Sequence, residues 1–269
     1  MKKNILFSII IPCYNTENTV LETLHSVYNL NYDNWEAIIV NDGSPDNLEA
    51  LVLDFIKIDK RFKYFKKENG GLASARNFGI KKAIGQYILP LDSDNKVRKE
   101  FLNWANDVIS LNIDTDIIYG DAQRFGENNS YWAVGPYNFN KLLISNYIDA
   151  CAIIKSDVFK KFGLYDEKMP YQGLEDWEMW LRCSSNKCNF HYLPKPTFDY
   201  RVTSNSMIRS FDKNMFKKSR KYIYNKYSNL YAKAFSELYN KSLYLEKKVG
   251  FVVNNPVFKL LKKIREFFK

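Results

Sequence analysis

The sequence predicts an α/β fold in which helices cover both faces of a mainly parallel central sheet. Three observations support this prediction. In the first half of the chain, short runs rich in β-branched residues alternate with longer segments whose apolar residues recur every three or four positions. Such alternation is typical of successive strand–helix–strand units. Polar clusters follow the predicted strands, and a change in composition near residue 211 marks the end of this α/β body.

Four strands are expected before residue 95. Phe7–Ile11 is rich in isoleucine, as a strand buried on both faces usually is. Val20, Leu24 and Val27 would share one face of a helix, which we expect over Glu17–Leu30. The later elements repeat this alternation. They are a strand over Ala37–Val40, a helix over Asn47–Ile58, a strand over Phe62–Phe65, a helix over Ala73–Ile84 and a strand over Tyr87–Leu91.

The second half is less regular. The segment Gln123–Tyr147 is rich in Asn, Gly and aromatic residues and shows no clear periodicity. Loops of this composition often determine substrate selectivity. The elements expected around it are helices over Lys99–Leu111, Ser156–Phe162 and Asp176–Cys183, and strands over Asp116–Tyr119, Phe190–Leu193 and Thr197–Arg201.

The positive charge is concentrated at the C-terminus. The 269 residues carry a formal net charge of +10, but residues 1–210 contain 25 basic and 26 acidic residues, whereas residues 211–269 contain 15 and 4. A chain of this length can bury one sizeable core with a smaller appendage. We therefore expect one α/β domain over residues 1–210 and a basic helical extension over residues 211–269.

The sequence gives no sign of secretion or membrane insertion. Its apolar N-terminal run is short and lacks a small-residue cleavage site, and no stretch of about 18 apolar residues occurs. Four cysteines in a chain of this length do not form a disulfide framework, and the spacing of Cys183 and Cys188 is poor for zinc. We expect a cytoplasmic protein with reduced thiols.

The polar clusters after the predicted strands should meet at one edge of the sheet. In an open parallel sheet, ligands bind where the loops at the carboxyl ends of the strands converge. No G-x-G-x-x-G follows the first strand and no G-x-x-x-x-G-K-[ST] occurs, so a nucleotide bound here would need its phosphates neutralised in another way. The clusters are Pro12-Cys-Tyr-Asn15, Asn41-Asp-Gly-Ser44, Asn69-Gly-Gly71 and Asp92-Ser-Asp94.

Asp92 and Asp94 are candidate metal ligands. In an extended or turn segment, two carboxylates separated by one residue can point to the same side. Such oxygens suit Mg²⁺ or Mn²⁺, which often bridge protein carboxylates to substrate phosphates. The same pattern also occurs in turns and helix caps, but here it follows an apolar strand. We expect a metal ion at this position to offset charge on a diphosphate leaving group.

The strand-end clusters belong to a set of five motifs. They are Ser8-Ile-Ile-Ile-Pro-Cys-Tyr-Asn15, Val40-Asn-Asp-Gly-Ser44, Asn69-Gly-Gly-Leu-Ala-Ser-Ala-Arg-Asn77, Leu91-Asp-Ser-Asp94 and Gly173-Leu-Glu-Asp-Trp-Glu-Met-Trp180. In order and spacing, this set resembles the bacterial family 2 glycosyltransferases with a GT-A fold, over roughly residues 4–210. The resemblance implies an inverting hexosyl- or N-acetylhexosaminyl-transferase. Such an enzyme would move a sugar from a nucleotide donor, expected to be a UDP-sugar, to a saccharide hydroxyl in surface polysaccharide, lipopolysaccharide or glycan biosynthesis.

The resemblance also implies a set of donor-binding residues. Asp42 would hydrogen-bond the base of the nucleotide, although Asp42-Gly43 on its own is equally well explained as a turn. Arg76 would contact the base or a phosphate, unless it pairs with a nearby carboxylate. Asp92 would face the ribose and Asp94 the metal. The residues expected to bind the nucleotide sugar are Pro12, Tyr14, Asn15, Asp42, Asn69, Arg76, Asp92 and Ser93.

The catalytic carboxylates are expected at the start of a helix. By the resemblance, Asp176 would act as the general base that takes the proton from the acceptor hydroxyl. Glu175 is the second candidate, although an acidic residue at a helix N-terminus is also explained by capping and the helix macrodipole. Trp177 and Trp180 share the apolar face of this helix, which favours a core position over a sugar-stacking one.

The sequence departs from the family at one position. Many relatives carry a His where Tyr200-Arg-Val-Thr203 has Thr203, and that His approaches the metal or the diphosphate. The two carboxylates of Asp92 and Asp94 are therefore expected to be the main protein ligands of the metal. Arg201, Ser206 and Arg209 are candidates for contact with the diphosphate.

The basic extension is interpreted as a membrane-surface element. Residues 213–233 interleave Lys and Arg with Tyr and Phe, and the apolar residues of 257–268 keep helical spacing. A basic amphipathic helix of this kind binds anionic lipid. We expect it to place the enzyme on the inner face of the cell membrane, near a lipid-linked acceptor. A helix packed on the catalytic domain and a homo-oligomer contact are the alternatives, and no nucleic-acid-reading motif accompanies the charge.

Two other classes of protein share parts of this pattern. A sugar-phosphate nucleotidyltransferase would carry a glycine-rich basic loop after the first strand, but Pro12–Thr16 contains neither Gly nor Lys. A non-catalytic nucleotide-sugar-binding or membrane scaffold protein would lack the metal ligands or the base. Asp92, Asp94 and Asp176 are all present.

Overall fold

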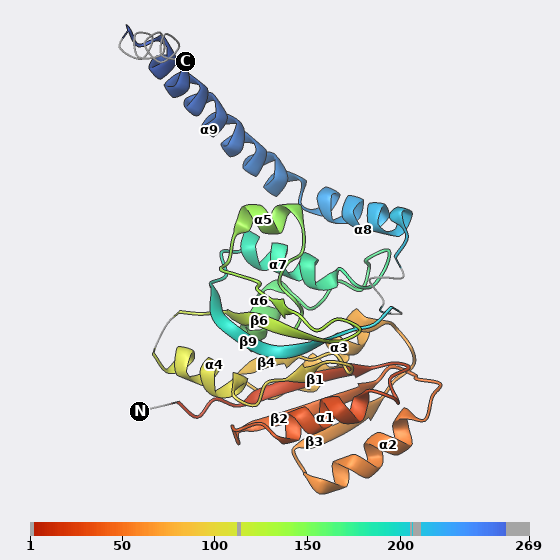
Figure 1. Ribbon diagram of the computed structural model, residues 1–269. Helices are drawn as coiled ribbons and strands as arrows, with labels where there is room; N and C mark the ends of the chain where they lie inside the picture. The colour runs from red at the N-terminus through yellow and green to blue at the C-terminus, as the bar shows by residue number, and fades with distance from the viewer. Residues whose placement is uncertain (1–2, 112–113, 205, 207–210, 257–269) are drawn as a thin grey trace. The chain divides into compact units, whose positions relative to one another are not determined.

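The computed structural model describes residues 3–111, 114–204, 206 and 211–256 (Figure 1). The chain divides into two compact units, Met1–Ile223 and Tyr224–Lys269. The first unit contains the sheet and the helices that cover it, and the described part of the second is mainly helical.

The first unit is built on a nine-stranded sheet (Figure 1). Its order is β3-β2-β1-β4-β8-β6-β9-β5, and β7 pairs with β6 outside this path. The strands are β1 (Phe7–Cys13), β2 (Trp35–Asn41), β3 (Phe62–Lys66), β4 (Tyr87–Pro90), β5 (Lys96–Val97), β6 (Ile117–Gly126), β7 (Tyr131–Trp132), β8 (Ile153–Lys155) and β9 (Phe190–Val202).

Helices connect these strands and extend beyond them. The helices of the first unit are α1 (Val20–Tyr28), α2 (Leu48–Phe55) followed by the short 3₁₀ turn η1 (Ile56–Ile58), α3 (Leu72–Lys82), α4 (Phe101–Ser110), α5 (Phe139–Ile144), α6 (Ser156–Phe162) and α7 (Glu175–Ser185). Two more follow, α8 (Lys213–Lys226) and α9 (Ser228–Asn254).

The N-terminal strands pair as the sequence predicts. β1 lies between β2 and β4, β2 also pairs with β3, and all three pairings are parallel. Every residue of β1 and β2 is buried, which explains their nearly continuous apolar sequence. The predicted α/β class is confirmed. Because the strands run in the same direction, the loops after β1, β2 and β4 emerge at the same edge of the sheet.

Helices cover both faces of this sheet (Figure 1). Alternate residues of β1 belong to a core shared with the apolar faces of α1, α2 and α4. The other face of β1 carries Ile10, against which α3 packs closely at Gly79. A Cβ on Gly79 would lie 2.5 Å from Ile10 Cγ2, so glycine permits this approach. Helix α3 is thereby held directly on the strands that lead to the polar loops.

The C-terminal half of the sheet is mixed and differs from the prediction in detail. The short strands β5 and β8 and the helix α5 were not expected, and α5 lies inside the segment thought to be irregular. The two strands expected on either side of Pro194 and Pro196 are one continuous strand, β9. Its pairing with β6 shifts between Gly120, opposite Leu193, and Asp121, opposite Pro196. This bulge accommodates both prolines in a strand that remains paired.

The second unit contains α9, a helix of 27 residues. Its exposed apolar side chains include Phe235, Leu238, Tyr239 and Leu245. None of the described helices is both long enough and apolar enough to cross a membrane. The amphipathic segment predicted over residues 257–268 lies outside the described residues, as does Arg209.

Candidate active site

A cavity of about 790 Å³ opens at the edge of the sheet where β1, β2 and β4 end. The loops after these strands line one part of its wall, and the N-termini of α3 and α7 line another. Ten of the predicted site residues lie on this wall. They are Pro12, Tyr14, Asp42, Asn69, Arg76, Asp92, Ser93, Asp94, Glu175 and Asp176.

Asn15 is the predicted site residue that is absent from the wall of the cavity. Its backbone adopts the left-handed conformation with a φ of 54°. Its backbone N–H donates a hydrogen bond to Ser44 Oγ at 2.8 Å. Asn15 therefore ties the loop after β1 to the loop after β2.

Asp42 is held in place at the end of β2. It is buried, and its carboxylate accepts hydrogen bonds from Lys67 Nζ at 2.7 Å and from the backbone N–H of Gly71 at 2.8 Å. The backbone N–H of Gly70 also donates to this carboxylate. These contacts connect the β2 loop to the glycine pair that precedes α3. The side chain of Asp42 is thus fixed against the wall of the cavity.

Gly43 allows the β2 loop to approach Asn69. Its φ of +69° is one that side-chain-bearing residues rarely adopt. A Cβ at this position would also lie 2.8 Å from the backbone nitrogen of Asn69. The glycine in the Asp42-Gly43-Ser44 motif is therefore required by a close approach of two loops. Both Asp42 and Asn69 line the cavity as a result.

Arg76 lies at the centre of the site and connects two of the sequence motifs. It is almost fully buried, and its guanidinium donates to Glu175 Oε1 and to Asp92 Oδ1, each at 2.6 Å. It also lies over the ring of Tyr165, with Cζ 5.4 Å from the ring centroid. The pairing with nearby carboxylates that the sequence left as an alternative is therefore present. Arg76 lines the cavity while joining Asp92 after β4 to Glu175 at the start of α7.

The Asp92-Ser93-Asp94 loop is fixed through its backbone. Thr19 Oγ1 donates to the carbonyl of Ser93 at 3.0 Å, and Arg201 Nε donates to the carbonyl of Asp94 at 2.9 Å. Arg201, a candidate for diphosphate contact, is thus occupied in supporting this loop. Burial, together with the charge of Asp92, raises the pKa of Asp94 to about 6. Burial and a neighbouring carboxylate both disfavour the ionised form, so their effects on this pKa add.

The donor set of this loop fits a divalent ion that also binds a substrate phosphate. Asp92 and Asp94 both reach the cavity, and Mg²⁺ is commonly bound by one or two carboxylates plus phosphate oxygens. No group of three or more His, Cys, Asp or Glu side chains suited to a metal occurs among the residues that the structure describes. An ion at this position would therefore depend on a bound diphosphate for further ligands.

Asp176 is the second residue of α7 and lines the same cavity. Its Oδ2 accepts a hydrogen bond from Asn146 Nδ2 at 2.7 Å, and its Oδ1 accepts one from the backbone N–H of Trp177 at 2.8 Å. Burial, followed by the charge of Glu175, raises the pKa of Asp176 well above its ordinary value. A carboxylate with a raised pKa is a stronger base than a solvated aspartate.

The tryptophans of α7 are core residues, as the helical spacing predicts. Trp177 and Trp180 are 1% and 0% exposed. Their indole N–H groups donate to the carbonyls of Leu142 and Ile148, at 2.7 and 2.9 Å. These bonds attach α7 to the segment that contains α5. Asn146, which contacts Asp176, lies on that segment.

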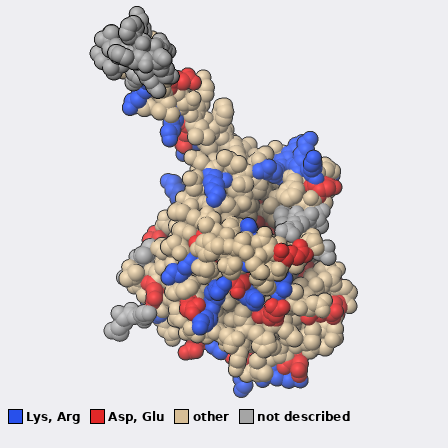
Figure 2. All heavy atoms as spheres, viewed as in Figure 1, with Lys and Arg blue, Asp and Glu red and all other residues tan. Residues whose placement is uncertain are grey.

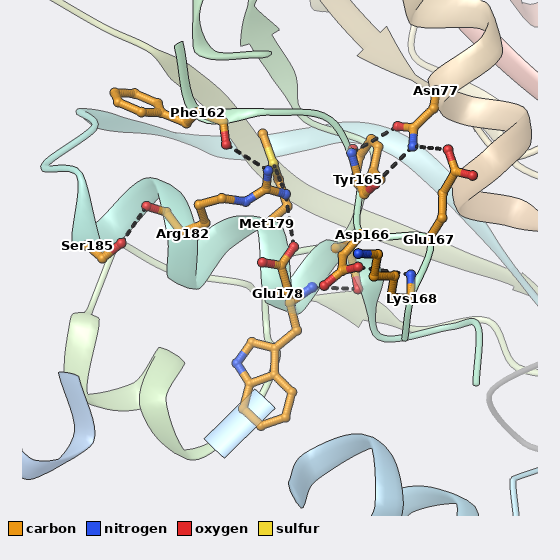
Figure 3. Close-up of polar contacts among 12 residues, drawn as sticks. Asn77, Phe162, Tyr165, Asp166, Glu167, Lys168, Glu178, Met179, Arg182 and Ser185 are labelled. Carbon is orange, nitrogen blue, oxygen red and sulfur yellow. Dashed lines mark hydrogen bonds and ion pairs between the residues drawn. The ribbon is translucent and has the colours of Figure 1, made fainter. Parts of the chain in front are cut away.

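A network of polar contacts holds α7 and the loop before it (Figure 3). Asn77 of α3 accepts a hydrogen bond from the backbone N–H of Tyr165, and its amide donates to the carbonyl of Tyr165 and to Glu167. Arg182 of α7 pairs with the fully buried Glu178 and donates to the carbonyl of Phe162. The Asn of the Ala-Arg-Asn motif thus positions the loop that leads to Asp176.

Asp149 is a cavity residue that the sequence did not indicate. It lies in the loop before β8, and the backbone N–H of Cys151 donates to its Oδ1 at 2.9 Å. Burial and the charge of Asp92 raise its pKa to about 7. The short apolar run that follows it was not recognised as a strand, so its place at a strand end was missed.

The remaining part of the wall comes from segments far apart in the sequence. Trp132 and Tyr200 contact each other edge to face with their ring centroids 5.6 Å apart. No spacing in the sequence predicts that these residues meet, because β6, β7 and β9 bring them together only through long-range pairing. The lining residues that were not predicted include Trp132, Asn146, Tyr147, Asp149, Gln172, Tyr200, Phe216 and Arg220.

The half-buried carboxylates of Asp92 and Asp94 after β4 and the carboxylate of Asp176 in the first turn of α7 face one cavity of an α/β sheet. The chain belongs to glycosyl transferase family 2, whose family model matches residues 8–163. It is 33% identical to an uncharacterized glycosyltransferase of Rickettsia typhi over 234 residues, which cover 79% of this chain and 71% of that protein. The chain spans between 23% and 71% of the length of the curated relatives considered.

Solved structures of two other proteins share the fold. S. aureus TarS 1–349 in complex with UDP-GlcNAc superposes with a TM-score of 0.66 and 20% identity, covering 80% of this chain and 64% of that one. The mannosyltransferase PcManGT from Pyrobaculum calidifontis, in complex with GDP-Man and Mn²⁺, gives a TM-score of 0.58 and 15% identity, covering 97% and 84%. The predicted GT-A type of fold is confirmed.

Proposed function

We propose that this chain is an inverting glycosyltransferase that moves a sugar from a nucleotide-diphosphate sugar to a hydroxyl of a saccharide acceptor. The observation that carries this proposal is the single cavity shared by Asp42, by the Asp92 and Asp94 pair, and by Asp176. These groups match the three parts of the reaction, which are nucleotide binding, neutralisation of the leaving diphosphate and removal of a proton. A UDP-sugar is the proposed donor, in keeping with the UDP-GlcNAc of TarS.

The nucleotide would bind at the ends of β1 and β2. Asp42 is held there by backbone N–H groups and Lys67, which orient its carboxylate to accept from a base imide or a ribose hydroxyl. Pro12, Tyr14 and Asn69 line the same part of the cavity. Arg76, by fixing Asp92, would set the position of the ribose and the diphosphate.

Asp92 and Asp94 would hold a Mn²⁺ or Mg²⁺ ion together with the diphosphate. Such an ion would offset the negative charge that develops on the leaving group. The support for this assignment is the pairing of two carboxylates on a loop whose backbone is fixed by Thr19 and Arg201. Mn²⁺ in the PcManGT structure is in keeping with it.

Asp176 would act as the general base. It would take the proton of the acceptor hydroxyl as that oxygen attacks the anomeric carbon of the donor sugar. The new bond forms on one face of the sugar while the bond to the diphosphate breaks on the other, so the anomeric configuration inverts. Asn146 would orient the Asp176 carboxylate, and Glu175 would hold the start of α7 through its ion pair with Arg76.

The product is proposed to belong to a surface polysaccharide, a lipopolysaccharide or another glycan. The second unit, Tyr224–Lys269, is proposed to attach the enzyme to the anionic inner face of the cell membrane. Its exposed apolar residues on α9 and its excess of Lys and Arg support this assignment. A homo-oligomer contact through α9 is the competing role for the same residues.

A screen of nucleotides tests the donor assignment most directly. A ligand that binds only the folded chain raises its melting temperature. We expect UDP with Mn²⁺ to stabilise the protein, and Asp94→Ala to remove the part of the stabilisation that depends on Mn²⁺. Lys81→Ala, an exposed residue outside the cavity, is the matched control. Metal-dependent stabilisation that survives in Asp94→Ala would remove Asp94 from the metal site.

A further inference from the structure

The first three turns of α8 present a basic face beside the cavity. Phe216 and Arg220 line the cavity wall. Lys213 and Lys217 are exposed and lie three or four residues from them, which places all four on the same side of the helix. We call Lys213, Phe216, Lys217 and Arg220 the α8 basic face. All four belong to the first compact unit.

The neighbouring sides of α8 attach the helix to the protein. Ser219 and Ile223 are 0% exposed, and Tyr222 Oη donates to Asp166 Oδ2 at 2.8 Å. Lys and Arg side chains gather on the surface of α8 (Figure 2). Within the described part of the chain, neither Lys213, Lys217 nor Arg220 forms an ion pair with a carboxylate. The cations of the α8 basic face are therefore available to an anionic ligand.

Arg220 lies on the side of the cavity where Asp176 lies. Its Nη2 donates to the carbonyl of Ile144 at 2.6 Å, and its Cζ lies 5.6 Å from the ring centroid of Trp177, the residue after Asp176. Two residues beyond Ile144, Asn146 contacts the Asp176 carboxylate. These contacts fix the guanidinium close to the proposed base, whereas Asp42 and Asn69 mark the nucleotide part of the cavity.

We infer that the α8 basic face binds a phosphate group carried by the acceptor, so that the acceptor is a phosphorylated saccharide. This inference rests on the proposed function, because it assigns the Asp176 side of the cavity to the acceptor. Arg and Lys form strong charge-assisted hydrogen bonds to phosphate oxygens. Asp149 and Asp176 would repel an anion deeper in the cavity, so the phosphate remains at α8 while an uncharged sugar hydroxyl reaches Asp176.

A direct binding experiment tests this inference. The probe is a fluorescently labelled dextran oligomer that carries phosphate groups, measured by anisotropy at low salt with UDP and Mn²⁺ present in excess to occupy the donor part of the cavity. A labelled dextran oligomer of similar length lacks the phosphate. We expect the wild-type chain to bind the phosphate oligomer at least about tenfold more tightly than the dextran. Equal affinity for the two probes would overturn the inference.

Charge reversal locates the binding surface. We expect K213E/K217E to weaken binding of the phosphate oligomer about tenfold or more. The control K81E/K161E changes net charge by the same amount at exposed lysines that do not line the cavity, and should change binding less than about twofold. Similar losses in both pairs would overturn the inference, because they would reflect net charge alone. An unchanged affinity in K213E/K217E would overturn it as well.

Two further measurements, vesicle binding and UDP binding, separate this inference from its alternatives. Vesicles of phosphatidylglycerol and phosphatidylcholine test whether the same lysines bind a lipid headgroup, and K213E/K217E should bind them as the wild type does. If K213E/K217E lost vesicle binding but kept oligomer binding, the face would belong to the membrane and the inference would be wrong. UDP binding is measured separately. If the wild type bound no UDP, the proposed function would fail, whereas intact UDP binding with no preference for phosphate would defeat this inference alone.

Discussion

Arg76 links the Asp92-Ser93-Asp94 loop to α7 through one partly buried and one fully buried ion pair. Its guanidinium contacts Asp92 and Glu175, and both Arg76 and Glu175 are 1% exposed. Removing one partner of a buried pair leaves the other charge without compensation, which is much more costly than losing a surface pair. The same residue thus supports the stability of the protein and the geometry of the site.

We expect Arg76→Met to lower the free energy of unfolding by about 3–5 kcal/mol, because Glu175 would stay buried without its partner. Urea denaturation measures this change. Lys57→Met is the matched control, since Lys57 and Asp54 form a pair in which both side chains are largely exposed. The control should lose less than about 1 kcal/mol. A similarly small loss in Arg76→Met would contradict the assignment.

The raised pKa of Asp176 predicts the pH dependence of the transfer reaction. A general base must be deprotonated, and burial beside Glu175 shifts deprotonation of Asp176 to higher pH. We expect kcat/KM to rise with pH through an apparent pKa well above ~3.9, the ordinary value for aspartate. Asp176→Asn should keep donor binding and lower kcat by about 10²–10⁴-fold. Near-normal turnover of Asp176→Asn would remove Asp176 from the role of base.

The raised pKa of Asp149 predicts that ionisation of this carboxyl lowers the stability of the folded chain. Its pKa is raised to about 7 in the folded chain, so the protonated form is favoured by folding and the stabilisation is lost as pH rises from about 4 to about 7. At pH 8, Asp149→Asn should therefore raise the melting temperature by roughly 2–4 °C. At pH 4 the difference should vanish. A lower melting temperature for the variant at pH 8 would show that the ionised carboxylate is stabilising.

At the scale of elements, local sequence patterns were sufficient to predict the helices and strands that are long and evenly buried. The strands β1 and β2 and the helix α3 occur where their apolar residues predict them. The short strands β5 and β8 carry too few residues for any periodicity. In β9, Pro194 and Pro196 are typical strand-breaking residues, and only pairing with β6 shows that the strand continues. Local sequence patterns could not predict these strands, because they depend on pairing between segments far apart in the chain.

The bulge in β9 predicts that Gly120 resists substitution. A Cβ on Gly120 would lie 2.8 Å from the carbonyl of Lys195 and 2.4 Å from Thr197 Cγ2. We expect Gly120→Ala to lower the free energy of unfolding by about 1–3 kcal/mol, as overpacking of a core usually does. Gly250→Ala in α9, where an added Cβ meets nothing within 4 Å, should show no loss. Equal stability of the two variants in thermal melts would contradict this account of the bulge.

Local motifs predicted the cavity residues that are proposed to bind nucleotide and metal, whereas on the proposed acceptor side they indicated only the segment Gln123–Tyr147. Asp42 and Asp92 directly follow strands, so strand prediction was enough to place them at one edge of the sheet. Phe216 and Arg220 reach the cavity from α8, which the sequence assigned to the extension beyond residue 210. Their approach depends on the burial of Ser219 and Ile223 and on the hydrogen bond from Tyr222 to Asp166, which no spacing rule reveals.

At the scale of the whole molecule, the chain combines a body of nearly balanced charge with a basic C-terminal part. Residues 224–269, which are proposed to contact the membrane, contain 10 Lys and Arg but only 3 Asp and Glu. Each basic residue near an anionic membrane contributes about 1 kcal/mol of attraction. The exposed apolar residues of α9 would add to this attraction by inserting among the lipid headgroups.

We expect removal of residues 224–269 to reduce binding to phosphatidylglycerol-containing vesicles at least about tenfold, since most of the basic extension is lost. Co-sedimentation measures the bound fraction. The shortened chain keeps Phe216 and Arg220, so its stabilisation by UDP and Mn²⁺ serves as the control for an intact cavity. Full vesicle binding by the shortened chain would show that the second unit does not attach the enzyme to membranes.

The two carboxylates of the Asp92-Ser93-Asp94 loop are not equivalent targets for mutagenesis. Asp92 shares Arg76 with Glu175, so its removal disturbs a buried ion pair as well as any metal bound there. Asp94 forms no such pair among the described contacts, and its neutralisation removes a charge that burial already disfavours. In an inactive Asp92 variant, a loss of stability could therefore not be separated from a loss of bound metal. Asp94 separates the proposed metal binding from stability, so an Asp94 variant is the one that would remove the proposed metal-dependent step while leaving the fold intact.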